Sequence, residues 1–341
     1  MKSIEKFKTY IIAEIGVNHN NKFNNAKRLI LEAKKCGADA VKFQTFKAST
    51  LANLWTKKVK YQKKHLRDHE THYEMLQKLE LSAENHLKLQ KYAKKVKIDF
   101  LSTPYDVESA KFLKERLRLN IFKVASADII DYQLHKYLSR SASQVIISTG
   151  MSNLNEINMA LKMYKKKTSI IIMHCVSNYP CSYSSINLNA LKILKKFGHT
   201  LGYSDHSIGN NSACLAVAMG AKVLEKHFTL NTKMVGPDHK ASLDPIGFKN
   251  FVKDIRLTEL ILGKSKKELQ KEELQMYQIS RKSLYFSKNL AKNTVIKYNS
   301  LTALRPNKID GLSPMMIPKI VGKRTKFAVK KFDLVNFKKI S

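Results

Sequence analysis

Residues 201–240 read LGYSDHSIGNNSACLAVAMGAKVLEKHFTLNTKMVGPDHK. Two apolar runs, 200–203 and 221–224, each lead into a polar cluster that contains a histidine, His206 in the first and His227 in the second. Between the runs, apolar side chains recur at helical spacing, so this stretch predicts a strand, a helix and a second strand. Strands joined in this way run parallel, and we therefore expect both histidines at one edge of a sheet.

The two histidines have two interpretations. A single histidine at the end of a strand is usually a structural residue held by hydrogen bonds. Two neutral imidazoles on consecutive strands can instead share one divalent metal ion and leave coordination positions open for a substrate. Asp205, Asp238 and His239 lie close in sequence, which keeps the metal site as an equal alternative.

The same alternation of apolar runs and helical patterns begins near residue 10. The predicted strands are 10–13, 40–43, 99–101, 121–124, 144–147, 169–173, 200–203 and 221–224. Helical patterns fill most gaps, for example 24–35, 83–95, 107–116, 154–164 and 188–196. Eight such units predict an α/β fold of the (β/α)₈ TIM-barrel type. A doubly wound open sheet is the competing arrangement, but no GxGxxG motif follows any strand.

Polar side chains follow every predicted strand. In chain order they are Glu14, Asn18 and His19; Lys42 and Gln44; Ser102 and Thr103; Lys123, Ser126 and Asp128; Ser148 and Thr149; His174, Cys175, Ser177 and Tyr179; Ser204, Asp205 and His206; and Glu225, Lys226 and His227. Any one serine or threonine here could be a helix cap. In a barrel, however, these ends converge on one mouth, where such folds carry their chemistry.

Lys42 and Lys123 lie where strand interiors give way to this mouth. A buried lysine needs an anionic partner. The partner could be Glu14 for one and Asp128 for the other, or a phosphate or carboxylate of a substrate. A small doubly anionic substrate such as an enol phosphate would also find hydroxyl donors at the mouth. These hydroxyls are Thr103, Ser126, Ser148 and Ser204. The rival chemistry is a metal-free Schiff-base aldolase centred on Lys123, because a desolvated amine is nucleophilic.

Composition limits the class of protein. The formal net charge of the 341-residue chain is +35, which allows a nucleic-acid-binding module. The lysines are nevertheless spread over most helices without a nucleic-acid-binding signature, so we expect solvated basic faces and no specific nucleic acid. No apolar run has the ~20 residues of a membrane span, and the polar start MKSIEKFKTY favours a cytoplasmic protein. Four cysteines without metal-ligand spacing suit a reducing compartment.

Two further regions stand apart from the barrel pattern. The connection 47–82, which contains Trp55 and Tyr61, is too long for an ordinary loop, and it is either a lid over the mouth or a surface excursion. We expect a barrel domain at 1–263, a charged connector at 264–280 and a small, mostly β domain at 281–341 that docks on a barrel. The apolar stretches of that domain are 283–286, 294–296, 319–321 and 327–329.

Nine motifs in order resemble the sialic acid synthase (N-acetylneuraminate synthase) family. They are IIAEIGVNHN, GADAVKFQTFKA, FLSTPYDVES, KVAS, ISTGM, HCVSNYP, GYSDHSIG, EKHFTL and GPDHKASLDP. The match runs from about residue 10 to residue 262. The tail resembles the antifreeze-protein-like domain that follows the barrel in those enzymes.

This resemblance implies condensation of phosphoenolpyruvate with an open-chain N-acylated mannosamine-type sugar, with C–O cleavage that releases phosphate. It implies that His206 and His227 bind Mn²⁺ or Mg²⁺, and that Glu14 and Asp128 are the other catalytic residues. The residues that it assigns to the enol phosphate are Lys42, Thr103, Lys123, Ser126, Ser148 and Ser204. Those that it places at the sugar are Glu14, Ser177, Tyr179 and Asp238, and Gln44 is a further substrate-binding residue. In the family's domain-swapped homodimers, the partner's tail supplies the arginine that matches Arg305.

Three departures from the family pattern bear on this assignment. The usual Gly-Ser-Gly-Glu is Ala125-Ser126-Ala127-Asp128 here, with a carboxylate one methylene shorter. Ser177 replaces an asparagine, and with the segment YEMLQKLELS it resembles legionaminic or pseudaminic acid synthases, which use a diacetamido trideoxyhexose. In the tail, RPNKIDGLSP replaces a shorter motif, and Asn293 and Phe332 stand at usual glycine positions.

Overall fold

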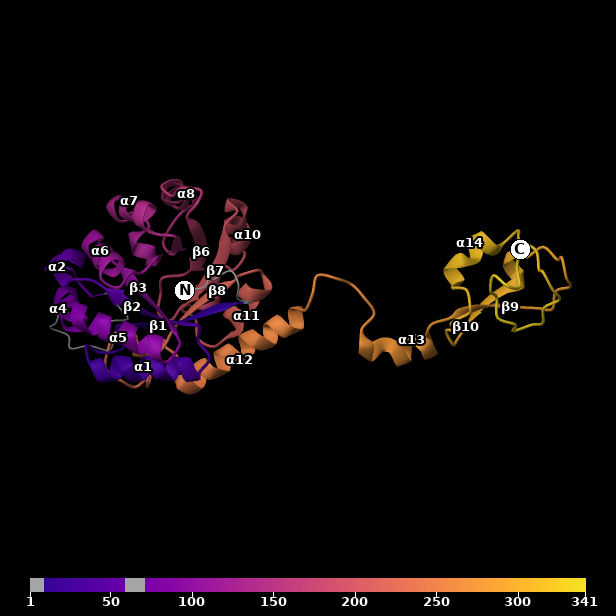
Figure 1. Cartoon of the computed structure of the whole chain (residues 1–341), viewed down its shortest axis with the longest axis horizontal. Coiled ribbons are helices and arrows are strands. Elements are labelled where there is room, and N and C mark those ends of the chain that lie inside the picture. The colour runs from indigo at the N-terminus through magenta and orange to yellow at the C-terminus, as the bar shows by residue number, and fades with distance from the viewer. Residues whose placement is uncertain (1–8, 59–70) are drawn as a thin grey trace. The chain divides into compact units, whose positions relative to one another are not determined.

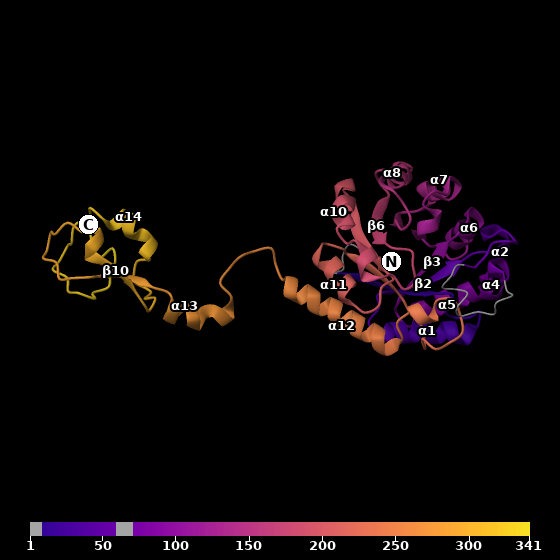
Figure 2. The same cartoon turned by 180° about the vertical axis from the view of Figure 1, so that it is seen from behind.

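The computed structural model describes residues 9–58 and 71–341 of the chain. They form two compact units, Met1–Gly263 and Lys264–Ser341, drawn in Figure 1 and from behind in Figure 2. Tyr61 of the long connection lies outside the described residues. In the part of the chain that is described, no helix has the length and apolarity to cross a bilayer.

The first unit is an eight-stranded parallel barrel, as predicted. Its strands are β1 (Tyr10–Gly16), β2 (Ala40–Thr45), β3 (Asp99–Pro104), β4 (Ile121–Val124), β5 (Gln144–Ser148), β6 (Ser169–Cys175), β7 (Thr200–Asp205) and β8 (Val223–His227). Hydrogen-bonded neighbours follow the order β3-β2-β1-β8-β7-β6-β5-β4. The two end strands, β3 and β4, are in contact and nearly close the barrel. The competing open doubly wound sheet is therefore excluded.

Helices cover the outside of the strands in both views (Figures 1 and 2). They are α1 (Phe23–Lys35), α5 (Ala83–Lys95), α6 (Val107–Glu115), α7 (Tyr132–Ser141), α8 (Leu154–Lys162), α9 (Tyr183–Ile186), α10 (Ala190–Leu194), α11 (Asn211–Ala218) and α12 (Pro245–Leu262). Side-chain caps fix several beginnings: Asn153 forms a capping box with Glu156, and Asp244 precedes a proline at the first turn of α12. The predicted helix at 188–196 is shorter, because 195–197 form a 3₁₀ turn.

The barrel interior changes character along each strand. Side chains that alternate inward form a buried apolar layer of Tyr10, Ile12, Ala40, Leu101, Ile121, Ile146, Ile171, Met173 and Val223. Two residues further on, the same face carries polar groups, for example Glu14 after Ile12 and Lys42 after Ala40. The strands extend through these polar residues, so the predicted strand 221–224 in fact runs from Val223 to His227. A closed apolar floor thus supports a polar mouth.

The described parts of the long connection form two helices, α2 (Ala48–Leu51) and α4 (His72–Leu79). Thr71 caps α4 in a capping box with Glu74. Both helices contribute to a small apolar cluster of Val17, Phe46, Ala48, Met75, Leu76 and Leu79. Trp55, between them, has 79% of its surface exposed. The two ends of the connection are therefore folded against the barrel.

The second unit has its own apolar core, which includes Leu284, Phe286 and Ile320. It contains α13 (Leu274–Ser280), an antiparallel pair of β9 (Ser283–Phe286) with β10 (Leu301–Leu304), and the short helix α14 (Ile317–Ile320). The expectation of a mostly β domain is only partly right, because apolar residues at 319–321 belong to α14 and its end. Segments 294–296 and 327–329 contribute isolated bridges.

Two turns of this unit need a left-handed backbone. Asn293 has φ of 65° and Phe332 has φ of 69°. A glycine adopts this conformation without strain, whereas an aromatic side chain rarely does. The turns at these two positions therefore keep a glycine-like backbone although the side chains have changed.

Candidate active site

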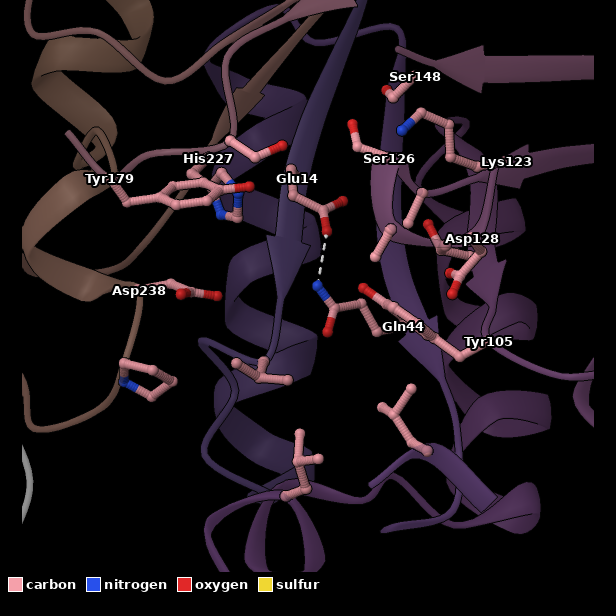
Figure 3. A pocket seen from close by; sticks show the side chains of 18 of the residues that line it. Glu14, Gln44, Tyr105, Lys123, Ser126, Asp128, Ser148, Tyr179, His227 and Asp238 are labelled. Atoms are coloured by element: carbon pink, nitrogen blue, oxygen red, sulfur yellow. Dashed lines mark hydrogen bonds between the residues drawn. The ribbon is translucent and has the colours of Figure 1, made fainter. Parts of the chain in front are cut away.

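The mouth of the barrel encloses a cavity of about 550 Å³. The residues that the family resemblance assigned to catalysis or binding line this cavity, except Arg305: Glu14, Lys42, Gln44, Thr103, Lys123, Ser126, Asp128, Ser148, Ser177, Tyr179, Ser204, His206, His227 and Asp238. Asp205 and His239, which lie near the two histidines in sequence, do not line it, and Asp205 pairs with Lys226 instead. Figure 3 shows many of them pointing into the same space. Arg305 follows β10 in the second unit and is exposed. Strand ends far apart in sequence are thus brought together.

Both predicted lysines are buried at this mouth. Lys42 Nζ lies 2.7 Å from Glu14 Oε2 and donates a hydrogen bond of 2.9 Å to Thr103 Oγ1. The predicted Lys42–Glu14 pair is therefore present. The other expected pair is wrong, because Lys123 Nζ has Glu225 Oε1 at 3.6 Å as its ion-pair partner instead of Asp128. Asp128 follows β4 on a 3₁₀ turn, Ser126–Asp128, which carries its carboxylate out of ion-pair reach.

Glu225 is the residue that the sequence reasoning missed. Its carboxylate lies between the two lysines, 3.5 Å from Lys42 Nζ and 3.6 Å from Lys123 Nζ, and accepts a 3.0 Å hydrogen bond from Ser204 Oγ. Burial raises its pKa, but Lys123 and Lys42 outweigh burial and lower the pKa to about 2. A signal existed in the sequence, since Glu225 is two residues before His227 and must share its face of β8.

Glu14 on β1 is level with a site residue on each of the two neighbouring strands. It pairs with Lys42 across β2 and with His227 across β8. Its Oε1 accepts a hydrogen bond of 3.3 Å from Gln44 Nε2, the dashed line in Figure 3. Burial raises the pKa of Glu14 and outweighs the opposing effect of Lys42, while the Glu225 carboxylate raises it further. This carboxyl can therefore hold or release a proton near neutral pH.

The two histidines face one another across β7 and β8. Their ring centroids are 5.7 Å apart, and both side chains are buried. The Nδ1–H group of His206 donates to the Val176 carbonyl at 2.7 Å, which leaves Nε2 as an acceptor. Burial lowers the pKa of His206 to about 4 and that of His227 well below its usual value, so both rings are neutral. The ring of Tyr179 lies 4.1 Å from that of His206.

The histidine pair fits a metal ion in three respects. Neutral imidazole is the ligand form, and the buried Nδ1 of His227 has no hydrogen-bond partner among the described residues. Two rings on one ion, with metal–nitrogen bonds of about 2.1 Å, place their centroids roughly 5 Å apart at tetrahedral or octahedral angles, slightly less than the observed separation. Within 9–58 and 71–341, however, no group of three or more His, Cys, Asp or Glu side chains forms a ready-made metal cluster. Oxygen ligands would have to come from substrate or water.

Hydroxyl groups line the part of the cavity that contains Lys123. Ser126 Oγ accepts a 3.0 Å hydrogen bond from the Gly150 amide and lies 3.0 Å from Cys175 Sγ. Ser148 Oγ has no partner in the described chain. Gly150 is required here, because a side chain would collide with the hydroxyls of Ser126 and Ser177. The side chains of Ser126 and Ser148 lie beside that of Lys123 in Figure 3.

Two further carboxyls border the cavity. In Figure 3, Asp128 and Asp238 lie on opposite sides of Glu14 and Gln44. Burial, reinforced by Asp131, raises the pKa of Asp128 to about 7, and its Oδ2 has no partner among the described atoms. Burial also raises the pKa of Asp238 to about 6. Both groups therefore titrate in the range useful for proton transfer.

Fold and site together define an α/β-barrel enzyme whose cavity is lined by buried lysines and neutral histidines. Comparison with known proteins narrows this class. Residues 29–267 match the model of the NeuB family. The chain belongs to that family, the sialic acid synthase family, and is a transferase of sialic acid biosynthesis type whose relatives use phosphoenolpyruvate to build sugar acids.

Individual relatives are synthases of the same kind. The chain is 42% identical over 322 residues to N,N'-diacetyllegionaminic acid synthase of Legionella pneumophila, covering 92% of this chain and 90% of that protein. The enzyme of the same name from Campylobacter jejuni is 43% identical, covering 93% of this chain and 95% of that protein. The crystal structure of N-acetylneuraminic acid (sialic acid) synthetase from Leptospira borgpetersenii is 33% identical, with a TM-score of 0.69, and covers 79% of this chain and 90% of that one.

Proposed function

We propose that this nonulosonic acid synthase condenses phosphoenolpyruvate with an open-chain diacetamido sugar of the trideoxyhexose type, as the names of its 42–43% identical relatives suggest. An N-acetylmannosamine-type acceptor, giving an N-acetylneuraminate-type product, is the second candidate. The observation that carries the proposal is the pair of buried lysines, Lys42 and Lys123, at one cavity with Ser148 and Asp128, which each have a polar atom without a partner among the described residues. The lysines pair with Glu14 and Glu225, so a dianionic enol phosphate would share their ammonium groups with these carboxylates and would accept hydrogen bonds from the hydroxyls.

In this proposal the chain binds the enol phosphate through charged and hydroxyl groups at the strand ends. The residues that bind it are Lys42, Thr103, Lys123, Ser126, Ser148 and Ser204. The acceptor lies toward Gln44, Ser177, Tyr179 and Asp238. His206 and His227 are the residues that would hold a divalent metal, manganese or magnesium, and such an ion supplies electrophilic polarisation of a carbonyl oxygen.

The proposed reaction forms a C–C bond to the sugar and breaks the bond between C2 and the phosphate oxygen. C3 of the enol phosphate forms a bond to the aldehyde carbon of the sugar, and the new alkoxide takes a proton, for which Glu14 is the candidate donor. Water adds to the electron-poor C2 and gives up a proton, for which Asp128 is the candidate acceptor because its pKa is about 7. The tetrahedral carbon then expels phosphate by C–O cleavage, the proton of its hydroxyl group leaves with the phosphate, and a 2-keto acid remains.

The test is phosphate release from phosphoenolpyruvate that carries oxygen-18 in its bridging C–O–P position. With an N-acylated amino sugar and divalent metal, we expect all of the label in inorganic phosphate. Unlabelled phosphate would mean P–O cleavage and would refute this chemistry. Omission of the sugar is the control, and it should abolish phosphate release.

A Schiff-base aldolase remains the rival, because burial lowers the pKa of the Lys123 amine, with Glu225 opposing. Borohydride treatment in the presence of pyruvate separates the two functions. A covalent adduct on Lys123 would support the aldolase, and its absence would leave the synthase. For the basic nucleic-acid-binding alternative, a shifted duplex or single strand at low salt would be the supporting result.

The proposal includes a homodimer with a domain-swapped, antifreeze-like second unit, in which the partner's Arg305 contacts the acceptor. Mixing inactive His227→Ala protein with inactive Arg305→Ala protein tests it, because a mixed dimer would contain one intact site and regain activity. No recovery in a mixture shown to exchange subunits would refute the swap. Four free cysteines fit the cytoplasm as the compartment.

A further inference from the structure

One wall of the active-site cavity is apolar, although the proposed substrates are polar. Val17, Leu51, Met75, Leu76 and Leu79 line it, and they are called the α2–α4 wall below. Four of them also belong to a packed apolar cluster, which fixes their positions. The strand ends that carry the lysines and carboxylates line another part of the same cavity, so the cavity has one charged and one apolar part.

The α2–α4 wall is held in place by contacts among described residues. The Glu80 carboxylate lies 2.8 Å from Lys47 Nζ and accepts a 2.7 Å hydrogen bond from the Ala48 amide. The His72 amide donates to the Thr56 carbonyl at 3.2 Å. Thr50 Oγ1 donates to Asp106 Oδ2 at 2.6 Å, which ties α2 to the beginning of α6. The apolar surface is therefore a built feature of the cavity.

A polar group accompanies this apolar surface. His72, the first residue of α4, lines the cavity, and its Nδ1 is buried without a hydrogen-bond partner in the part of the chain described. Asn53 lines the same region. A ligand that matches this part of the cavity has an apolar group for the leucines and an amide for His72 or Asn53. A chain of hydroxyl groups would match it poorly, because each hydroxyl against the leucines loses a hydrogen bond to water.

Orientation of the acceptor follows from the chemistry. Its aldehyde carbon must lie beside the enol phosphate at the strand ends, so the opposite end of the sugar points away from the floor. We propose that the α2–α4 wall binds this far end and selects an acceptor with a methyl group and a second acylamino group in place of hydroxyls. This inference rests on the proposed function and adds the residues that choose the acceptor.

The experiment compares kcat/KM for 2,4-diacetamido-2,4,6-trideoxymannose with kcat/KM for N-acetylmannosamine. The wild type should prefer the trideoxy sugar. Leu76→Gln places an amide in the wall and should lower the preference about tenfold or more through KM, because a hydroxyl against an apolar pocket changes specificity by roughly 10- to 100-fold. The KM for phosphoenolpyruvate should not change. Leu51→Gln, at a half-buried position, should act in the same direction if Leu76→Gln does not fold.

The matched control is Leu54→Gln, the same chemical change in the same connection. Leu54 is 56% exposed and does not line the cavity, so its preference ratio should equal that of the wild type. Equal changes for both sugars in the wall variants, or a wild type that prefers N-acetylmannosamine, would overturn the inference while the synthase remains. Absence of phosphate release with either sugar would reject the proposed function, and the inference with it.

Discussion

The strand ends and the α2–α4 wall border one cavity but are built differently. At the strand ends, Lys42, Glu225 and His227 project from a hydrogen-bonded barrel, and each is more than nine-tenths buried. The wall stands on two short helices of a long connection, and ion pairs such as Lys47–Glu80 hold it with one partner largely exposed. In the proposed function, the barrel therefore fixes the reaction, whereas the connection can change the acceptor without disturbing the chemistry.

The largest effect is expected at the histidine pair. His227→Ala should lower kcat about a thousandfold or more, because electrophilic assistance by a bound ion is worth several kcal/mol. Exhaustive chelation of the wild type should have a similar effect, and added Mn²⁺ or Mg²⁺ should restore the wild type only. Phosphate release is the measurement.

His199→Ala is the matched control for this change. His199 precedes β7 at its amino end and does not line the cavity, so its removal should leave kcat within a few-fold of the wild type. Activity that survives both chelation and His227→Ala would contradict the metal-assisted reaction and weaken the contrast between the two parts of the cavity.

The buried charges should also contribute strongly to folding. Lys42→Met leaves Glu14 and Glu225 with one fewer cation, and breaking a buried pair typically costs about 3–5 kcal/mol of unfolding free energy. Urea denaturation measures the loss. Lys35→Met is the control, because the Lys35–Glu32 pair is exposed and should cost less than ~1 kcal/mol. Equal losses would mean that Lys42 is not held as the structure indicates.

The pH dependence of kcat should distinguish a change at Asp128 from a change in the α2–α4 wall. Its pKa is raised to about 7, so the carboxylate required as a proton acceptor disappears as the pH falls through 7. If Asp128 accepts the proton of water, kcat should fall about tenfold per unit below that pH. The same shift means that the folded state binds this proton more tightly, so the contribution of Asp128 to stability is present at low pH and is lost as the pH rises through 7.

Asp128→Asn tests this assignment. The variant should have a kcat lower by about a hundredfold, since general base catalysis contributes roughly 10²- to 10⁴-fold. The fall of its kcat below pH 7, which is the acid limb of the pH profile, should also vanish. Leu76→Gln should keep the acid limb of the wild-type profile. An unchanged limb in Asp128→Asn would assign the titration to another group.

The same contrast explains what the sequence could predict. The alternation of strands with helices, and the rule that barrel chemistry lies at the carboxyl ends of strands, predict Lys42, Lys123 and both histidines at one mouth. Glu225 has no predicted role because the sequence shows it only as part of the polar cluster Glu225-Lys226-His227. Its position on the same face of β8 as His227 becomes evident only when the strand is extended to His227. The partner of Lys123 was assigned wrongly since Asp128 sits on a 3₁₀ turn, where spacing gives no direction.

The wall lay beyond sequence reasoning. Its residues come from β1's following loop, α2 and α4, and no periodic rule brings Leu51 to Met75 and Leu76. These residues come together through tertiary contacts, which local sequence patterns do not encode. One example is the contact of the Glu80 carboxylate with Lys47 and with the Ala48 amide, called the Glu80 clasp below. Apolar residues in α4 are also typical of ordinary helix packing, and only the cavity shows that they border the candidate active site.

The smallest expected effect concerns that clasp. Glu80→Gln removes the charge opposite Lys47 but keeps an oxygen that can accept from the Ala48 amide, so stability should fall by only ~0–1 kcal/mol. Because the clasp positions the wall and not the strand ends, we expect KM for the acceptor sugar to rise a few-fold, with kcat and the KM for phosphoenolpyruvate unchanged. Glu84→Gln is the control, since the Glu84–Lys88 pair is similarly close but exposed on α5, away from the cavity. An increase in the KM for phosphoenolpyruvate equal to that for the sugar would show that the two parts of the cavity are mechanically coupled, and the separation of chemistry from acceptor choice would fail.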